Sequence, residues 1–371
     1  MERKIKKQII ADLNKKMVFI VGPRQVGKTW LAKDIAKSFN RTVYLNYDNS
    51  NDREIIENEM WLIDSELVIF DEIHKMPNWK NYLKGVYDTK PEKMKILVTG
   101  SARLDAFRQA GDSLAGRFFT HRLLPFSYKE IFPKKKNIKE FIACGGFPEP
   151  FLAENETEVN RWRKQYVDSL IRNDVLDFEN IHNFKAISLI LELLQKRVGS
   201  PISFQSIAED VKISPNTVKK YIQILETLFI VFRITPFSKN IARSLLKEPK
   251  IYFYDNGMVK GDDGAKFENF IANSLLKQVW GEEDSLGTEI SLHYLRTKDK
   301  KEVDFCIVKN SIPQKIIEVK LSDKNLSKEL FYFHSKYQIP ASQIVLNLKT
   351  ERRFEEITLR KAELFLSELD Y

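Results

Sequence analysis

Short apolar runs separated by helical patterns occupy the first third of the chain. Residues 17–21, 67–70 and 95–99 are almost wholly apolar and rich in β-branched side chains, which is typical of strands buried on both faces of a parallel sheet. Residues 42–48 and 119–125 supply two further strand candidates. Strands that alternate with helices predict an α/β fold with a doubly wound parallel sheet, whose ligand lies at the carboxyl edge.

A glycine motif joins the first of these strands to a helical segment. Residues 22–29 read Gly-Pro-Arg-Gln-Val-Gly-Lys-Thr, which matches the Walker A pattern G-x-x-x-x-G-K-T in its strand-to-helix context. The glycines let backbone N–H groups face phosphates, and the helix N-terminus adds its positive dipole end. We expect Lys28 to reach the β- and γ-phosphates of ATP and the Thr29 hydroxyl to bind Mg²⁺. The predicted nucleotide-binding residues are Gly22, Pro23, Arg24, Gln25, Val26, Gly27, Lys28, Thr29 and Trp30.

Two carboxylates end the strand at residues 67–70. Asp71 and Glu72 follow four apolar residues, which is the Walker B arrangement. A buried strand would deliver Asp71 to the carboxyl edge, where it holds Mg²⁺ directly or through water. Glu72 would then be the catalytic base that polarises the attacking water. The alternative is that both are ordinary solvated loop residues.

Further polar residues near this edge are candidates for catalysis. Thr99 or Ser101, at the tip of the strand at residues 95–99, is expected to sense the γ-phosphate. Arg103 and Arg117 are candidates for stabilising charge in the transition state, and an arginine finger acting across a subunit boundary would imply a homo-oligomer. A structural salt bridge is the alternative for each arginine.

Several motifs together resemble a widespread bacterial and archaeal family, whose members join an AAA-type ATPase domain to a C-terminal domain of unknown function. The matching motifs are residues 22–29, 70–74 (Phe-Asp-Glu-Ile-His), 99–103 (Thr-Gly-Ser-Ala-Arg), 113–117 (Ser-Leu-Ala-Gly-Arg), 124–131 (Leu-Pro-Phe-Ser-Tyr-Lys-Glu-Ile), 144–149 (Cys-Gly-Gly-Phe-Pro-Glu) and 248–257 (Glu-Pro-Lys-Ile-Tyr-Phe-Tyr-Asp-Asn-Gly). The resemblance spans nearly the whole chain and implies ATP binding, but it says little about biological role.

The middle of the chain predicts a winged helix-turn-helix. Helical patterns cover residues 187–198, 203–212 and 215–229, and β-rich runs at 230–235 and 250–254 form a candidate hairpin. Ser214 and Pro215 are a strong helix start signal. Polar residues share one face of that third helix, which in such folds often enters a major groove: Asn216, Lys219, Lys220 and Gln223. The alternative is a packing module without DNA contact.

The C-terminal part carries a nuclease-like pattern. Asp304 and Glu318-x-Lys320 lie on two predicted strands, similar to the D…(D/E)-x-K signature of the restriction-endonuclease-like superfamily. Asp304 and Glu318 would share a Mg²⁺ ion, Glu268 on an upstream helix would add a carboxylate, and Lys320 would help activate water. The alternatives are a fold that has lost cleavage and a salt bridge between Lys320 and Asp304.

Composition adds a partner hypothesis and a compartment. The formal charge is +9 and the pI about 9.2, which suggests a polyanionic partner such as DNA or RNA. The alternative is a merely lysine-rich surface, and of the two nucleic acids DNA is the expected partner. The two cysteines form no disulfide framework or paired metal spacing, no stretch reaches the length of a membrane span, and the charged start lacks a signal-peptide core. We expect a cytoplasmic protein without membrane contact.

These patterns predict four domains. They are an AAA-type ATPase at residues 1–135, a helical lid or linker at 136–182, a winged helix at 183–258 and a restriction-endonuclease-like domain at 259–371. The leading hypothesis is an ATP-hydrolysing, DNA-associated protein whose ATPase controls the nuclease-like domain. The alternatives are a nucleotide-dependent switch that acts on a protein partner with an inactive C-terminal domain, and an endonuclease fold used only for dimerisation.

Overall fold

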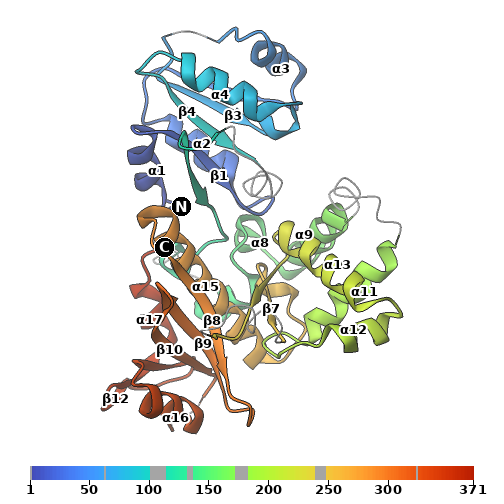
Figure 1. Ribbon diagram of the computed structural model, residues 1–371, viewed down its shortest axis with the longest axis vertical. Helices are drawn as coiled ribbons and strands as arrows, with labels where there is room; N and C mark the ends of the chain where they lie inside the picture. The colour runs from blue at the N-terminus through green and yellow to red at the C-terminus, as the bar shows by residue number, and fades with distance from the viewer. Residues whose placement is uncertain are drawn as a thin grey trace. The chain divides into compact units, whose positions relative to one another are not determined.

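The chain divides into two compact units. The computed structural model describes residues 2–61, 64–100, 114–131, 137–171, 183–238, 248–322 and 325–371. The first unit is Met1–Leu124 and the second is Pro125–Tyr371. Figure 1 shows the first in blue to blue-green and the second in green to red.

The first unit alternates strands with helices, as the apolar pattern predicted. Its described elements are α1 (Lys6–Leu13), β1 (Met17–Val21), α2 (Lys28–Ala36), β2 (Thr42–Asn46), α3 (Ser50–Glu57), β3 (Leu67–Asp71), the 3₁₀ helix η1 (Ile73–Lys75), α4 (Trp79–Thr89), β4 (Lys95–Thr99) and β5 (Phe118–Arg122). In the described part of the unit, the strands form one parallel sheet in the order β2-β3-β4-β1-β5. The α/β prediction with a parallel sheet is therefore confirmed.

Both faces of this sheet are covered, which explains the continuous apolar runs. Phe19, Phe70 and Val98 point to one face and join a core with Trp79 and Leu83 of α4, the helix that crosses the strands in Figure 1. The intervening residues of each strand are also buried, and α1 and α2 pack on β1, β3 and β4. A strand buried on both faces needs apolar residues at every position.

The second unit begins with short helices and a helical cluster. Its first elements are α6 (Tyr128–Ile131), α7 (Ile138–Cys144), α8 (Pro148–Leu152), α9 (Glu156–Ser169), α11 (Phe184–Lys196), α12 (Phe204–Val211), α13 (Pro215–Thr227), β6 (Val231–Ile234), β7 (Lys250–Phe253) and the 3₁₀ helix η3 (Asn256–Met258). The predicted helical ranges agree with α11, α12 and α13 to within three residues. The Ser214 side chain caps α13 by accepting from the Thr217 N–H, and β6 pairs antiparallel with β7. These are the elements expected for a winged helix, which itself remains a prediction.

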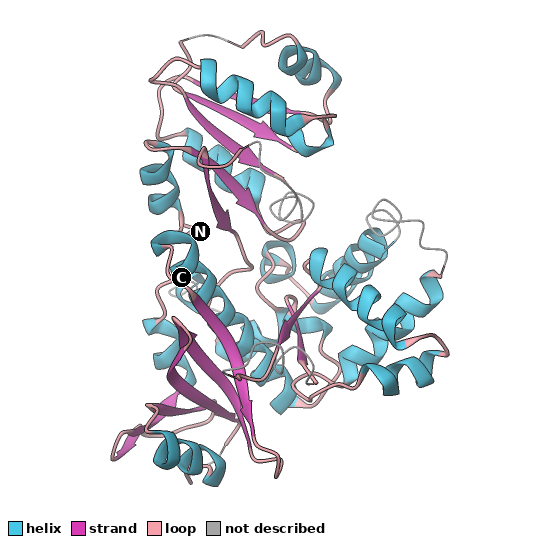
Figure 2. Ribbon diagram, in the orientation of Figure 1, coloured by secondary structure: helices cyan, strands magenta, loops and turns pink. Residues whose placement is uncertain are grey.

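A mixed sheet and long helix α15 form the rest of this unit. The elements are α15 (Asp263–Leu286), β8 (Ile290–Arg296), β9 (Glu302–Lys309), β10 (Ile312–Lys320), α16 (Lys328–Tyr337), β11 (Ala341–Val345), β12 (Arg352–Phe354), β13 (Ile357–Lys361) and α17 (Ala362–Glu368). Among the described residues the strand order is β12-β13-β11-β10-β9-β8, with β10, β11 and β13 parallel to one another. Figure 2 shows these strands in magenta.

The structure draws the main boundary earlier than the sequence did. Residues 125–131 belong to the second unit, because the Phe126 N–H donates to the Gly146 carbonyl and Lys277 on α15 pairs with Glu130 at 2.5 Å. The three segments predicted as separate domains after residue 135 pack into that one compact unit. No helix in the described ranges has the length and apolarity that crossing a membrane requires.

Candidate functional site

The phosphate loop lies between β1 and α2 at the carboxyl edge of the first sheet. Gly22 has φ +148°, and a side chain there would overlap the Leu123 carbonyl. Gly27 precedes the first residue of α2 with φ +97°. Both positions need a residue without Cβ, so the glycines of the motif are explained by backbone geometry.

Lys28 is buried inside this loop, with 8% of its surface exposed. Its Nζ donates to the carbonyl oxygens of Gly22 at 3.0 Å and Pro23 at 2.6 Å. Burial lowers the pKa of Lys28 to about 8, although the carboxylates of Glu72 and Asp71 act in the opposite direction. The ammonium is therefore short of charge partners, which a phosphate would supply.

Asp71 ends β3 and collects hydroxyl donors from neighbouring elements. Its Oδ2 accepts from Thr29 Oγ1 at 2.9 Å and from the Tyr44 hydroxyl at 2.5 Å. Its Oδ1 accepts from Thr99 Oγ1 at 2.5 Å. The two predicted magnesium ligands, Thr29 and Asp71, are thus in direct contact, and Thr99 reaches the same carboxylate.

Glu72 follows in a left-handed backbone conformation with φ +57°. Its N–H donates to the Thr99 carbonyl at 2.9 Å, and its Oε2 lies 3.4 Å from His74 Nε2. Burial raises the pKa of Glu72, with Lys28 opposing that shift and Asp71 adding to it. A non-glycine residue held at positive φ is typical of a functional constraint, and a raised pKa suits a general base.

The other residues predicted for this site divide into three groups. Arg24 is half-buried in the loop, whereas Gln25 and Trp30 are exposed. Arg117 precedes β5 at the amino edge of the sheet, about 16 Å along the strands from the phosphate loop, and makes two hydrogen bonds with Asp88 at 2.8 and 3.0 Å. This contact is the salt bridge that the sequence analysis gave as the alternative for Arg117. Ser101 and Arg103 lie outside the described residues.

Sequence analysis missed two residues that hold this site. Tyr44 on β2 donates to Asp71, but in the sequence it stood out only as part of a predicted strand. Arg3 is buried near the chain start and donates to the carbonyls of Val26 at 2.5 Å and Leu124 at 3.1 Å. Arg3 thus ties the phosphate loop to the last residue of the first unit.

In the second unit, the predicted nuclease-like residues do come near one another. Asp304 Oδ2 on β9 accepts from the Val319 N–H of β10 at 2.9 Å. Burial raises the pKa of both Glu268 and Glu318 to about 7, and the charge of Asp304 adds to each shift. Lys320 Nζ lies 2.8 Å from Glu318 Oε1.

A lysine, however, lies among the carboxylates of the predicted metal site. Among the described residues, no three His, Cys, Asp or Glu side chains are arranged to hold a metal ion. Instead, Lys250 on β7 places its Nζ 3.4 Å from Glu268 Oε1 and 3.6 Å from Asp304 Oδ1. The Mg²⁺ site predicted from Glu268, Asp304 and Glu318 stays a prediction, and the structure adds to these acids a buried lysine, which the sequence presented only as part of a β-strand.

The polar face of α13 is exposed as predicted. Asn216, Lys219, Lys220 and Gln223 are all exposed, whereas Val218 and other apolar residues of the helix are buried. The helix therefore presents two lysines and two amides on a face that its own unit leaves accessible.

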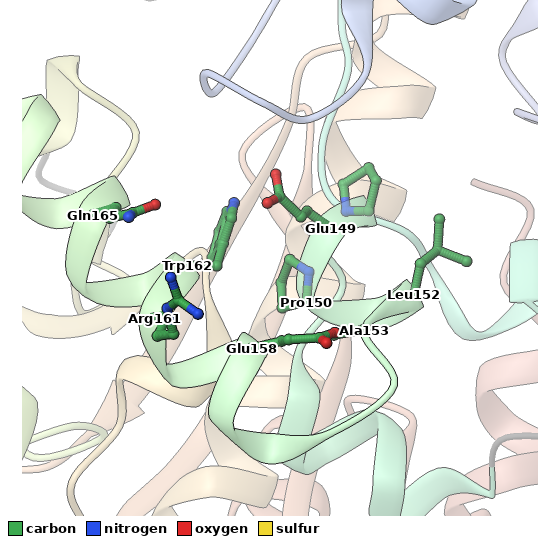
Figure 3. Close-up of a pocket in the computed structure, with 9 residues that line it drawn as sticks. Glu149, Pro150, Leu152, Ala153, Glu158, Arg161, Trp162 and Gln165 are labelled. Carbon is green, nitrogen blue, oxygen red and sulfur yellow. The ribbon is translucent and has the colours of Figure 1, made fainter.

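A separate cleft of about 670 Å³ lies between α8 and α9 of the second unit. Figure 3 shows Pro150 and Leu152 on one side and Arg161 and Trp162 on the other. Its lining contains none of the residues that the sequence predicted for catalysis or binding.

The fold and site of the first unit define a P-loop ATPase domain. Residues 14–132 match the family described as an AAA domain, residues 135–261 match a domain of unknown function (DUF8612), and residues 263–361 match a second domain of unknown function (DUF4143). The chain therefore has an AAA-type P-loop ATPase domain at its N-terminus, followed by domains whose function is unknown. The resemblance to an AAA-type family is confirmed at this level.

Curated relatives carry no assigned function. An uncharacterized protein of Methanocaldococcus jannaschii is 25% identical in an alignment of 394 positions, which covers 94% of this chain and 85% of the relative. One of Mycobacterium tuberculosis is 23% identical over 365 residues, covering 91% and 80%. Among solved structures, the Walker-type ATPase PABY2304 of Pyrococcus abyssi superposes with a TM-score of 0.46 at 13% identity, over 69% of this chain and 94% of that chain.

Proposed function

We propose that this protein is a DNA-associated ATPase in which Mg²⁺–ATP turnover in the first unit is coupled to DNA binding by the second. The observation that carries the proposal is the exposed polar face of α13, formed by Asn216, Lys219, Lys220 and Gln223 in a chain of net charge +9. A capped helix with lysines and amides on its exposed face has the chemistry to contact phosphates and base edges.

The residues of the first unit support a specific role for each side chain in ATP hydrolysis. Lys28 would exchange the carbonyls of Gly22 and Pro23 for the β- and γ-phosphates. Thr29 and Asp71, already in contact at 2.9 Å, would hold Mg²⁺, which when bound supplies positive charge to the phosphates. Glu72 would orient the attacking water and accept its proton.

Supporting residues would keep the acidic pair in position. The hydroxyls of Tyr44 and Thr99 each bond one oxygen of Asp71 at 2.5 Å, so the carboxylate has little freedom to rotate. His74 lies beside Glu72. Such outer contacts orient metal-binding groups.

The decisive experiment measures ATP turnover with and without duplex DNA, at two salt concentrations. We expect DNA to stimulate turnover, and the double substitution Lys219→Glu with Lys220→Glu to remove the stimulation while leaving basal turnover intact. Each lost phosphate contact should lower the slope of log affinity against log salt by ~0.9. The matched control is Lys328→Glu with Lys349→Glu, which makes the same charge change at exposed positions of the same unit.

A second candidate function is a nucleotide-dependent switch that acts on a protein partner. The observation in its favour is Lys250, whose ammonium lies among the carboxylates of the nuclease-like pattern and leaves that domain without a metal trio in the described residues. If the wild-type protein does not bind duplex DNA and its ATP turnover is unchanged by DNA, the DNA-associated ATPase is rejected. The switch then becomes the leading hypothesis.

A further inference from the structure

Lys250 is a buried lysine at the start of β7, with 1% of its surface exposed. Backbone contacts fix its position: β7 pairs with β6, Lys250 itself bridges Pro201, and the Pro249 carbonyl accepts from the Ile202 N–H at 2.9 Å. An ammonium in such a place must be paired, since burying an isolated charge is very unfavourable.

Its partners are carboxylates from two other elements. Lys250 Nζ lies 2.8 Å from Glu302 Oε1 and 3.6 Å from Asp304 Oδ1, both on β9, and 3.4 Å from Glu268 Oε1 on α15. An ammonium has three N–H donors, so one lysine can serve all three acids. Burial alone would lower the pKa of Lys250, but the surrounding carboxylates, Glu268 foremost, outweigh it and raise the pKa above its ordinary value.

Two of these acids, Glu268 and Asp304, are among those that the nuclease-like pattern assigns to a divalent metal, and both already have partners. Asp304 uses Oδ1 for Lys250 and Oδ2 for the Val319 N–H. Glu268 Oε1 also accepts from the Tyr252 hydroxyl at 2.7 Å. An ammonium that forms ion pairs with these oxygens would repel a second cation. The arrangement therefore does not fit a bound divalent ion.

One acceptor of the cluster remains unused. Glu318 is 5% exposed, and its Oε2 is buried without a hydrogen-bond partner in the described structure. Asp304 is close enough for its charge to act on Glu318 as well as on Glu268. Lys320 Nζ lies 2.8 Å from the other oxygen of Glu318, so the cation beside this acid is also a lysine of the chain.

We propose that the Lys250 ammonium is the permanent cation of this cluster and takes the place of a divalent metal, so that the second unit binds no such metal while Lys250 is present. Lys250 belongs to the segment that matches the first domain of unknown function, and its acids belong to the segment that matches the second. The ion pairs thus join these two segments. The inference is independent of DNA binding and ATP turnover.

The test is a Mn²⁺ titration of the nucleotide-free protein, with free ion measured by electron paramagnetic resonance. The wild type and the Asp304→Asn variant should bind the same amount of Mn²⁺, because the cluster holds no metal in the wild type. Lys250→Met should gain one site at least tenfold tighter than any in the wild type, and adding Asp304→Asn should abolish it. Lys315→Met is the matched control, because Lys315 is a half-buried lysine on β10 that faces Phe365 instead of the cluster.

Two results would overturn the proposal. One is a wild-type Mn²⁺ site that disappears in Asp304→Asn, because the cluster would then hold a metal beside the lysine. The other is a folded Lys250→Met protein that binds Mn²⁺ no better than Lys315→Met. Circular dichroism checks folding, and Lys250→Gln provides a second uncharged variant. If both Lys250 variants fail to fold, the comparison of wild type with Asp304→Asn still decides whether a metal occupies the cluster.

Discussion

The lysine of the phosphate loop is predicted to destabilise the nucleotide-free protein that it serves. Lys28 is nearly inaccessible, and its ammonium is bonded to the neutral carbonyls of Gly22 and Pro23. Burial lowers its pKa from 10.5 to about 8 against the opposing effect of Glu72 and Asp71. The folded chain therefore pays a free-energy penalty for keeping Lys28 charged until phosphate binds.

The size of this penalty follows from linkage between protonation and folding. One pKa unit corresponds to about 1.4 kcal/mol, so the shift from 10.5 to about 8 is worth about 3 kcal/mol. Below pH 8 Lys28 is charged in both states and the whole penalty is present. Stability rises between pH 8 and 10.5, because the unfolded chain still binds a proton that the folded chain has lost, and by pH 10 about 1 kcal/mol of the penalty remains.

Substitution of Lys28 by Met removes the charge and keeps the side-chain length. Allowing about 1 kcal/mol for the lost hydrogen bonds, we expect Lys28→Met to raise the free energy of unfolding at pH 7 by about 2 kcal/mol while abolishing ATP turnover. Urea unfolding of the nucleotide-free protein at pH 7 and pH 10 measures the effect, which should vanish at pH 10. Lys37→Met, at an exposed lysine just after α2, should change stability by less than about 0.5 kcal/mol.

A Lys28→Met protein no more stable than wild type at pH 7 would refute this reasoning. The same holds for a gain that persists unchanged at pH 10, since a pH-independent gain would come from packing and not from the removed charge. Loss of turnover alone would not distinguish the two, because Lys28 is expected to contact the phosphates in either case.

Three further predictions concern side chains with other roles. Glu72→Gln should still bind ATP but lower kcat by about 10²–10⁴-fold because the water loses its base, as fluorescent-nucleotide binding and steady-state turnover will show. Tyr44→Phe removes the 2.5 Å bond to Asp71 and should raise the Mg²⁺ concentration for half-maximal turnover at least tenfold; an unchanged Mg²⁺ dependence would contradict a positioning role. Lys250→Met should lower the free energy of unfolding of the second unit by about 3–5 kcal/mol, the usual result of leaving buried carboxylates unpaired, and a urea midpoint equal to that of wild type would exclude this.

The sequence alone determined the phosphate loop and its setting. Residues 22–29 are contiguous, and the positive φ angles of Gly22 and Gly27 are a local reason for the two glycines. The carboxyl-edge position of Asp71 follows from the rule that parallel strands buried on both faces are apolar throughout. The capped start of α13 at Ser214 is local in the same sense. Such features depend on neighbouring residues, so a linear pattern carries them.

The tertiary structure decided which distant side chains complete these sites. Tyr44 reaches Asp71 only because β2 lies beside β3, and Arg117 is placed at the opposite edge from the phosphate loop by the direction of β5. Lys250 meets Asp304, which lies 54 positions further along the chain. A linear pattern of charge cannot reveal these contacts, because each depends on the order and direction in which strands pack. Asp304 and Glu318 were correctly predicted to lie on neighbouring strands, but only the fold showed that the cation among these acids is a lysine of the chain itself.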